Sequence, residues 1–347
     1  MAFKKYHALM AYFGSKRKIV PYIFQHLPKP KKGETIKFLD PFMGGGSVSI
    51  YAKQLGYEVT GGDVSYRASI TGQALIANDK EQIPPLPVLM AEKKYERFVH
   101  EHYGDRFFFT VTETLDRLRE GIKKRGDKPI EMMLYMKLLT YYMPFGMLIR
   151  KIPPPPEGYK DRKKMEAEWI RQLSEHKVYG RSIPEFINPF KVVRRQIDNI
   201  NHGVFSNGKN NKFIHAPAWE VIDKHGQDAD IVYLDPPYPA TLSYEESDWI
   251  DKCLFRDQDF VQAFGTEWTD KNKFLDTYRT TIEKTKHIPN YIMSIGNWDP
   301  EELLSILREY RPKAELFSIK HNWLRSLSKK DRGDELMLID LEAWYDG

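Results

Sequence analysis

The clearest hydrophobic pattern in the chain is a short apolar run that stops abruptly at two prolines. Ile231-Val232-Tyr233-Leu234 is rich in β-branched and aromatic residues, as expected of a parallel strand buried on both faces. Asp235-Pro236-Pro237-Tyr238 follows, and because proline has no N–H for a neighbouring strand, the chain must leave the sheet there. We therefore predict a central strand with Asp235 at its carboxyl end, where open α/β sheets bind their ligands.

A second pattern, nearer the amino terminus, combines two strands, a glycine turn and a helix. Residues 36–40 predict a strand, and three glycines at 44–46 then allow a tight turn that side chains would obstruct. Residues 47–55 predict a helix, and residues 57–60 predict the next strand. This order is typical of one nucleotide-binding half of a doubly wound α/β sheet.

Asp40 and Asp63 mark the carboxyl ends of these two strands, with Asp63 just beyond the second. An acid at the second position suits ribose hydroxyls. The glycine spacing is not that of a dinucleotide site, and no Walker lysine followed by Ser or Thr is present. We therefore expect a nucleoside ligand without phosphates, the alternative being a glycine-rich connection that binds nothing.

The last third of the chain completes the sheet. Residues 291–295 and 336–339 predict two further strands. Between them, Asp299 is placed as the N-cap of a helix, with proline first and two glutamates in its first turn. The fold class is therefore α/β.

Residues 71–200 have a different character and predict an inserted, mostly helical region. A strongly apolar helix is expected over 131–142, and four prolines at 153–156 predict an extended spacer. The expected organisation is a catalytic domain from 1–70 and 201–347, interrupted by this insertion.

Charge is segregated along the chain although the net charge is only +5. Residues 1–37 hold nine Lys and Arg against one acid, and residues 121–215 hold 19 against nine. Such segregation suits a partner with a polyanionic backbone. One cysteine, Cys253, and no long apolar run predict a protein of the reducing cytoplasm without a membrane span.

The residues after the central strand suit an amino group on a planar heterocycle. Asp235 offers an anionic acceptor, Pro236 a fixed carbonyl acceptor, and Tyr238 a flat aromatic face. Hydrogen bonds from the amine to the first two would favour a tetrahedral nitrogen with an available lone pair. The alternative is a strand-ending turn with a solvent-facing carboxylate.

The Asp-Pro-Pro-Tyr sequence and the Phe42-x-Gly44-x-Gly46 turn together resemble the amino-methyltransferases of DNA. The order of a basic Gly-Ser-Lys opening, the glycine turn, a long insertion and then Asp-Pro-Pro-Tyr is similar to the alpha group, typified by Dam-type DNA adenine methyltransferases. The resemblance covers most of the chain. It implies the Rossmann-like fold of methyltransferases that use S-adenosylmethionine (SAM), with an inserted, mostly helical target-recognition domain at 71–200.

The resemblance also implies a cofactor site. The expected SAM-binding residues are Tyr12, Lys16, Asp40, Phe42, Gly44, Gly46, Asp63, Trp219 and Asp235. Trp219 falls on a family motif of an acid followed by an aromatic residue, in which the acid is absent here.

The same resemblance assigns Asp235, Pro236 and Tyr238 as catalytic residues that hold a flipped adenine, without a metal ion. The expected DNA contacts are Arg150, Lys151 and Tyr244, the last at the start of a polar loop over 244–249 that could close over the substrate.

The predicted function is site-specific methylation of the exocyclic amine of adenine in double-stranded DNA, by a cytoplasmic monomer with a cognate restriction endonuclease as a possible partner. Methylation of RNA or of the cytosine amine remains open, since these substrates present a similar planar amine. A non-catalytic regulator that binds SAM or DNA is the remaining alternative.

Overall fold

A seven-stranded sheet is the centre of the computed structural model. The structure describes residues 6–10, 15–25, 27–104, 107–142, 157–158, 160–172, 188–239, 248–261, 267–296, 298–319 and 335–341. The strands are β1 (Lys37–Asp40), β2 (Glu58–Asp63), β3 (Lys212–His215), β4 (Ile231–Leu234), β5 (Asn290–Ile295), β6 (Glu315–Ile319) and β7 (Glu335–Asp340). Their order across the sheet is β3-β2-β1-β4-β5-β7-β6.

The sheet is mostly parallel. β1 pairs in parallel with β2 and β4, and the same direction continues to β3 and β5. Only β7 runs the other way, antiparallel to both β5 and β6. The carboxyl ends of β1, β2 and β4 therefore meet at one edge of the sheet, which is where ligands bind in open parallel sheets.

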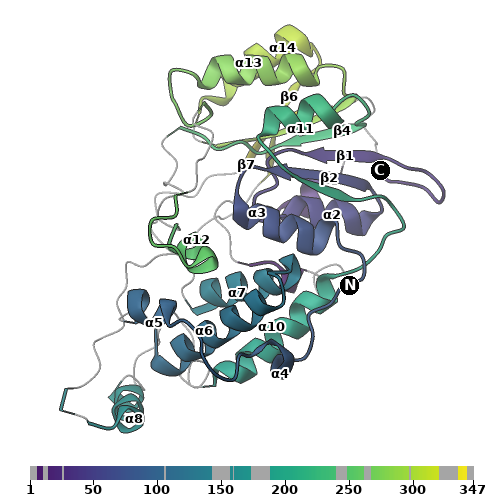
Figure 1. The fold of residues 1–347 in the computed structure, drawn as a ribbon. Coiled ribbons are helices and arrows are strands. Elements are labelled where there is room, and N and C mark those ends of the chain that lie inside the picture. Colours follow the sequence, from purple (N-terminus) through teal and green to yellow (C-terminus); the bar gives the residue numbers. More distant parts are fainter. Residues whose placement is uncertain are drawn as a thin grey trace.

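Helices cover both faces of the sheet (Figure 1). On one face lie α2 (Ser47–Leu55), α3 (Tyr66–Thr71) and the π-helical turn η3 (Gly72–Ile76), and on the other lie α11 (Ala218–His225), α13 (Phe274–Thr285) and α14 (Pro300–Tyr310). α12 (Asp248–Phe255) follows the Asp-Pro-Pro-Tyr segment and packs on α7 (Pro129–Tyr142).

Alternation along the strands divides the apolar side chains between two cores. Phe38 and Tyr233 point to the face covered by α2, whereas Leu39 and Val232 point to the face covered by α11 and α13. All four side chains are at most 1% exposed. This three-layer arrangement is that of a doubly wound α/β fold, as the strand and helix pattern predicts.

Where the structure describes the chain between η3 and β3, it is mostly helical, and these helices lie below the sheet in Figure 1. Its other helices are α4 (Leu86–Leu89), α5 (Phe98–Tyr103), α6 (Phe109–Lys124), α8 (Arg162–Gln172) and α10 (Pro189–Gly203). α7 is buried almost all round, and the apolar core of this region is continuous with the core under α2 and α3. α10 crosses the predicted boundary at residue 200.

Three details differ from the sequence-based expectation. β2 extends through Gly61 and Gly62, so that Asp63 is the last residue of the strand rather than a residue beyond it. The edge strands β3 and β6 were not predicted; their partly exposed side chains lack a continuous apolar run. The polar loop expected over 244–249 gives way to α12 at Asp248.

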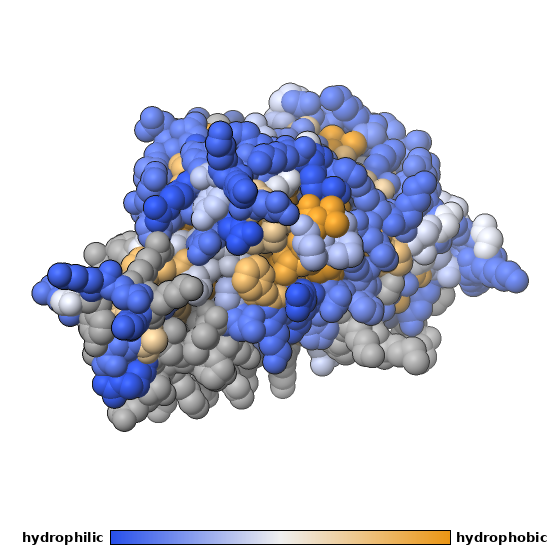
Figure 2. Space-filling model, turned by 60° about the horizontal axis from the view of Figure 1, so that its bottom comes forward, coloured by the Kyte–Doolittle hydropathy of each residue, from blue (hydrophilic) through white to orange (hydrophobic). Residues whose placement is uncertain are grey.

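The outer surface is largely polar. The face shown in Figure 2 is mostly hydrophilic, with apolar side chains gathered near its middle. Among the helices that the structure describes, none is long and apolar enough to cross a membrane.

Candidate active site

Three carboxylates converge at the carboxyl edge of the sheet. Asp40 ends β1, Asp63 ends β2 and Asp235 follows β4, and these strands are direct neighbours. The charges of Asp63 and Asp235 both act on Asp40 and help to raise its pKa. The site is therefore acidic, and a cationic ligand would favour the ionised form of Asp40.

Asp235 forms an ion pair with Lys16, a contact that the sequence did not predict. Lys16 belongs to the short 3-10 turn η2 (Lys16–Lys18), and its Nζ lies 3.1 Å from Oδ1 of Asp235. The Lys16 side chain is 10% exposed and that of Asp235 is 25% exposed. The ammonium group thus orients the carboxylate, while the Asp235 side chain stays accessible from outside.

Asp40 is fully buried and has unused hydrogen-bonding capacity. Its Oδ2 accepts a hydrogen bond from the Ser49 hydroxyl at 2.7 Å, whereas its Oδ1 has no partner among the described residues. Desolvation raises the pKa of Asp40 to about 8, with smaller contributions from Asp235 and Asp63. A buried acceptor without a partner is costly, so this atom marks a place for a donor or a cation.

Asp63 fixes the glycine turn to the end of β2. Its Oδ2 accepts the Gly44 N–H at 2.8 Å, and its Oδ1 accepts the Ser65 N–H at 2.8 Å. Gly44 and Gly46 have φ values of 51° and 75°, in the left-handed region that favours glycine. The turn therefore presents backbone rather than side chains beside Asp63, and a carboxylate with two bonds still has lone pairs for ribose hydroxyls.

Tyr238 is buried against the second core rather than displayed at the surface. It is 4% exposed, its hydroxyl donates a hydrogen bond to the Ser294 carbonyl, and its ring lies 5.5 Å from that of Phe274. A Cβ at Gly296 would come within 2.3 Å of the Tyr238 ring, so glycine is required there. The ring is held firmly by these contacts, and its role in stacking stays a prediction.

Other aromatic side chains surround Tyr238. Phe42, of the glycine motif, meets Trp268 edge to face at a centroid distance of 5.4 Å, and Trp268 in turn contacts Phe274. Trp298 also stacks on Phe274, with the two ring centroids 4.4 Å apart. The sequence motif indicated only Phe42, because the other rings come from segments without a recognisable pattern.

The remaining predicted residues fall in three places. Pro236 is buried directly after Asp235. Trp219 is 58% exposed at the start of α11, just after β3, whose last residue pairs with Asp63. Four predicted residues lie outside the described part of the chain: Tyr12, Arg150, Lys151 and Tyr244.

A buried ion pair anchors the segment that follows Asp-Pro-Pro-Tyr. Nε of Arg67 on α3 lies 3.2 Å from Oδ2 of Asp251 on α12, and both side chains are at most 4% exposed. Burial raises the pKa of Asp251 to about 6. This pair therefore ties the helix after the catalytic segment to the helix after Asp63.

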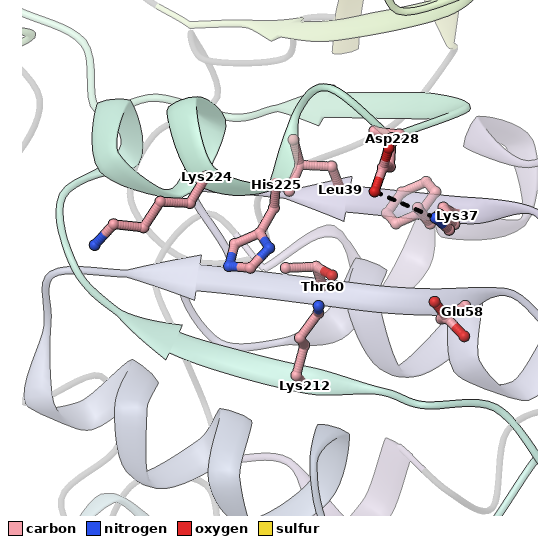
Figure 3. Close-up of a pocket in the computed structure, with 10 residues that line it drawn as sticks. Lys37, Leu39, Glu58, Thr60, Lys212, Lys224, His225 and Asp228 are labelled. Atoms are coloured by element: carbon pink, nitrogen blue, oxygen red, sulfur yellow. Dashed lines mark ion pairs between the residues drawn. The ribbon is translucent and has the colours of Figure 1, made fainter.

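A polar depression lies away from this site, near the amino ends of β1, β2 and β3 (Figure 3). Lys37 and Asp228 form an ion pair at 3.6 Å across one side of it, and Lys224 and His225 of α11 line another. It does not include the carboxyl edge of the sheet. Among the described residues, no three His, Cys, Asp or Glu side chains, those of Asp40, Asp63 and Asp235 included, are arranged to hold a metal ion together.

The strand order, the glycine turn and Asp-Pro-Pro-Tyr after the central strand together define the class as an amino-methyltransferase of DNA. The family model of the D12 class N6 adenine-specific DNA methyltransferases matches residues 12–147. This match supports a DNA adenine methyltransferase and confirms the resemblance, the fold class and the enzymatic activity expected from the sequence.

Two relatives support this assignment. The chain is 27% identical to the Type II methyltransferase M2.HphI of Haemophilus parahaemolyticus over 343 residues, which cover 94% of this chain and 96% of that protein. It is 21% identical over 333 residues to the modification methylase StsI of Streptococcus sanguinis, covering 87% of this chain and 46% of that relative. The chain therefore spans nearly all of the first relative and about half the length of the second.

Proposed function

We propose that this adenine methyltransferase takes its methyl group from SAM and that Asp235, oriented by Lys16, holds the exocyclic amine of a flipped adenine. The ion pair between Lys16 and Asp235, beside the buried carboxyl group of Asp40, is the observation that carries the proposal. Asp235 would be the accessible hydrogen-bond acceptor for the amine, and the carboxyl group of Asp40 would lie near the sulfonium cation.

The residues at the sheet edge fit SAM. Asp40 and Asp63 would face a cationic ligand, and Oδ1 of Asp40 is a buried acceptor without a partner among the described residues. The turn at Gly44 and Gly46 would let the ligand approach the backbone closely, and Asp63 would accept ribose hydroxyls. The exposed ring of Trp219 would lie against the adenine of the cofactor.

Asp235 and Pro236 would act directly on the substrate amine. When bound, SAM supplies an electrophilic methyl group on a sulfonium centre. Asp235 would accept a hydrogen bond from the amine, with the Pro236 carbonyl accepting another, and these bonds would favour a tetrahedral nitrogen with an available lone pair. Lys16 would hold the carboxylate of Asp235 in a fixed orientation, so that positioning and electrostatic stabilisation would supply much of the rate enhancement.

The adenine must leave the duplex first, because its amine is engaged in base pairing. Tyr238 would stack on the extruded base, and the insertion at 71–200 would grip the surrounding DNA, with Arg150, Lys151 and Tyr244 as contacts. The names of the two relatives further support a place in a restriction-modification system, with a cognate endonuclease as the functional partner of a monomeric enzyme.

The donor and the substrate class are tested together by incubating the protein with tritium-labelled SAM and duplex DNA, single-stranded DNA or RNA. The proposal requires label in duplex DNA. Label only in RNA would contradict the DNA assignment, and no transfer to any of the three, with SAM bound, would favour the non-catalytic regulator.

We expect Asp63→Ala to weaken SAM binding by about 1–3 kcal/mol, because charge-assisted hydrogen bonds to the ribose are lost. The variant also loses the acceptors for the Gly44 and Ser65 N–H groups, so the turn itself loosens. Calorimetric titration with SAM measures the effect, and thermal melting of the unliganded variant shows whether the fold is kept. Unchanged affinity in a folded variant would remove Asp63 from the site.

SAM binding should also depend on pH through Asp40. Because the pKa of the buried Asp40 carboxyl group is about 8 and a cationic ligand favours its ionised form, binding below pH 8 must release a proton. The affinity should therefore rise by up to about tenfold per pH unit as the pH approaches 8, and then level off. Asp40→Asn has no such proton, and comparing the two proteins separates Asp40 from titration of SAM itself. Parallel pH profiles would contradict the prediction.

A further inference from the structure

Three cationic side chains come together where the N-terminal segment meets the helical insertion. They are Arg17 of η2, Lys137 of α7 and Arg195 of α10. Burial, together with the positive charges of Arg17 and Arg195, lowers the pKa of Lys137 to about 7. Burial likewise lowers the pKa of Arg17 to about 10. The three charges therefore repel one another in a partly desolvated place.

Hydrogen bonds to neutral groups fix the three side chains. Lys137 donates to the carbonyls of His7 and Ala8, at 2.9 Å for the latter, and Arg17 donates to the Met10 carbonyl. These bonds satisfy donors, but their carbonyl acceptors are neutral and supply no counter-charge.

Arg195 is the exposed member of the group. It donates to the Tyr141 hydroxyl at 2.6 Å, and its guanidinium lies 5.3 Å from the centre of the Tyr141 ring. Tyr141 stands one helical turn after Lys137 on α7, which places Arg195 over the same face of that helix. Tyr141 thus holds the guanidinium in place while the Arg195 side chain remains exposed.

No described carboxylate forms an ion pair with Arg17, Lys137 or Arg195. The sequence gives a reason, since residues 1–33 and 132–156 contain no aspartate or glutamate at all. Elsewhere in the described structure, buried cations are matched by acids, as Arg67 is by Asp251 and Arg311 by Asp340. An unmatched group of three cations is therefore a site at which an external anion would be strongly favoured.

We propose that this cluster binds the phosphate backbone of the substrate DNA beside the flipped nucleotide, with Arg195 as the contacting residue and Arg17 and Lys137 as supporting charges. The proposal rests on the proposed function. Arg17 directly follows Lys16, whose ammonium pairs with Asp235, so the cluster is linked to the catalytic edge through adjacent residues. A guanidinium that is exposed and held by an aromatic residue suits the geometry of a phosphodiester group.

The test is the salt dependence of duplex DNA binding, measured by fluorescence anisotropy for the wild-type protein, Arg195→Ala, Arg195→Lys and Tyr141→Phe. Loss of one phosphate contact in Arg195→Ala should lower the slope of log affinity against log salt by about one and weaken binding roughly three- to tenfold near physiological salt. Arg195→Lys keeps the charge and should keep the slope. Tyr141→Phe loses the hydroxyl that orients the guanidinium and should weaken binding less than Arg195→Ala.

Arg279→Ala is the matched control. Arg279 pairs with Glu309 between α13 and α14, at the opposite end of the molecule from α10 in Figure 1, and its removal should leave DNA binding unchanged. SAM affinity and thermal stability should stay close to wild type in Arg195→Ala. An unchanged salt slope in that variant would overturn the proposal even if the wild-type enzyme methylates DNA. A wild-type protein that does not bind DNA would overturn the proposed function as well.

Discussion

Asp235→Ala is expected to reduce methyl transfer at saturating SAM and DNA by about 100- to 10,000-fold, the range for a residue that positions and polarises a reacting group. The amine would lose the acceptor that localises its lone pair. SAM affinity should change by less than about tenfold, since a typical hydrogen bond contributes about 0.5–1.5 kcal/mol and the variant keeps Asp40 and Asp63 in the site. Single-turnover transfer and calorimetric titration with SAM measure the two effects separately.

Asp235→Asn separates charge from packing in this test. Alanine leaves the buried ammonium of Lys16 without its partner at 3.1 Å, and so lowers stability as well as activity. Asparagine keeps an oxygen acceptor for Lys16 and should melt closer to the wild type, yet it should still transfer methyl groups slowly. A methyl-transfer rate of Asp235→Ala within a few-fold of the wild-type rate would contradict the proposed mechanism.

Tyr238→Ala is expected to lose activity by orders of magnitude because the extruded adenine loses its aromatic partner, a contact worth about 1–3 kcal/mol by alanine substitution. The burial of Tyr238 adds a second loss, since removing a large buried ring costs roughly 3–5 kcal/mol of stability. The measurements are methyl transfer and the fluorescence of 2-aminopurine at the target position, which brightens on flipping. Both are made at a temperature where melting curves show every variant folded.

Two further variants assign the role of the Tyr238 ring. Tyr238→Phe keeps the aromatic surface and loses only the hydrogen bond to the Ser294 carbonyl, so it should retain most activity. Tyr238→Leu fills much of the buried space without an aromatic face and should fail nearly as badly as alanine. Normal flipping and transfer in the leucine variant would make Tyr238 a packing residue alone. Failure of the phenylalanine variant would show that its hydroxyl is essential.

The strands next to the candidate site could be predicted because the sequence of each strand and of the turn after it shows whether the strand is buried and where it ends. Ile231 to Leu234 is apolar at every position, as a strand covered on both faces must be, and two prolines mark its end. The glycines at 44–46 likewise predict a turn, and the positive φ values of Gly44 and Gly46 explain why glycine is needed there. The edge strands β3 and β6 carry no such signal, since each has only one strand neighbour and partly exposed side chains.

The electrostatics of the site could not be predicted in this way. The contact between Lys16 and Asp235 joins residues that are far apart in the sequence, and nothing in either local sequence predicts it. The raised pKa of Asp40 depends on burial beneath α2 and on acids from two other strands. The inward packing of Tyr238 depends on Phe274 and Gly296, which belong to later elements. Motifs indicate candidate reacting groups, whereas tertiary structure determines the charge and orientation of these groups.

The most direct test of the central claim is nucleoside analysis by mass spectrometry after duplex DNA is incubated with the protein and SAM carrying a deuterated methyl group. The account predicts that the label appears as N6-methyl-2′-deoxyadenosine with wild-type protein, and that Asp235→Ala yields little or none. Label on the cytosine amine, or equal amounts of labelled adenine with Asp235→Ala, would contradict it.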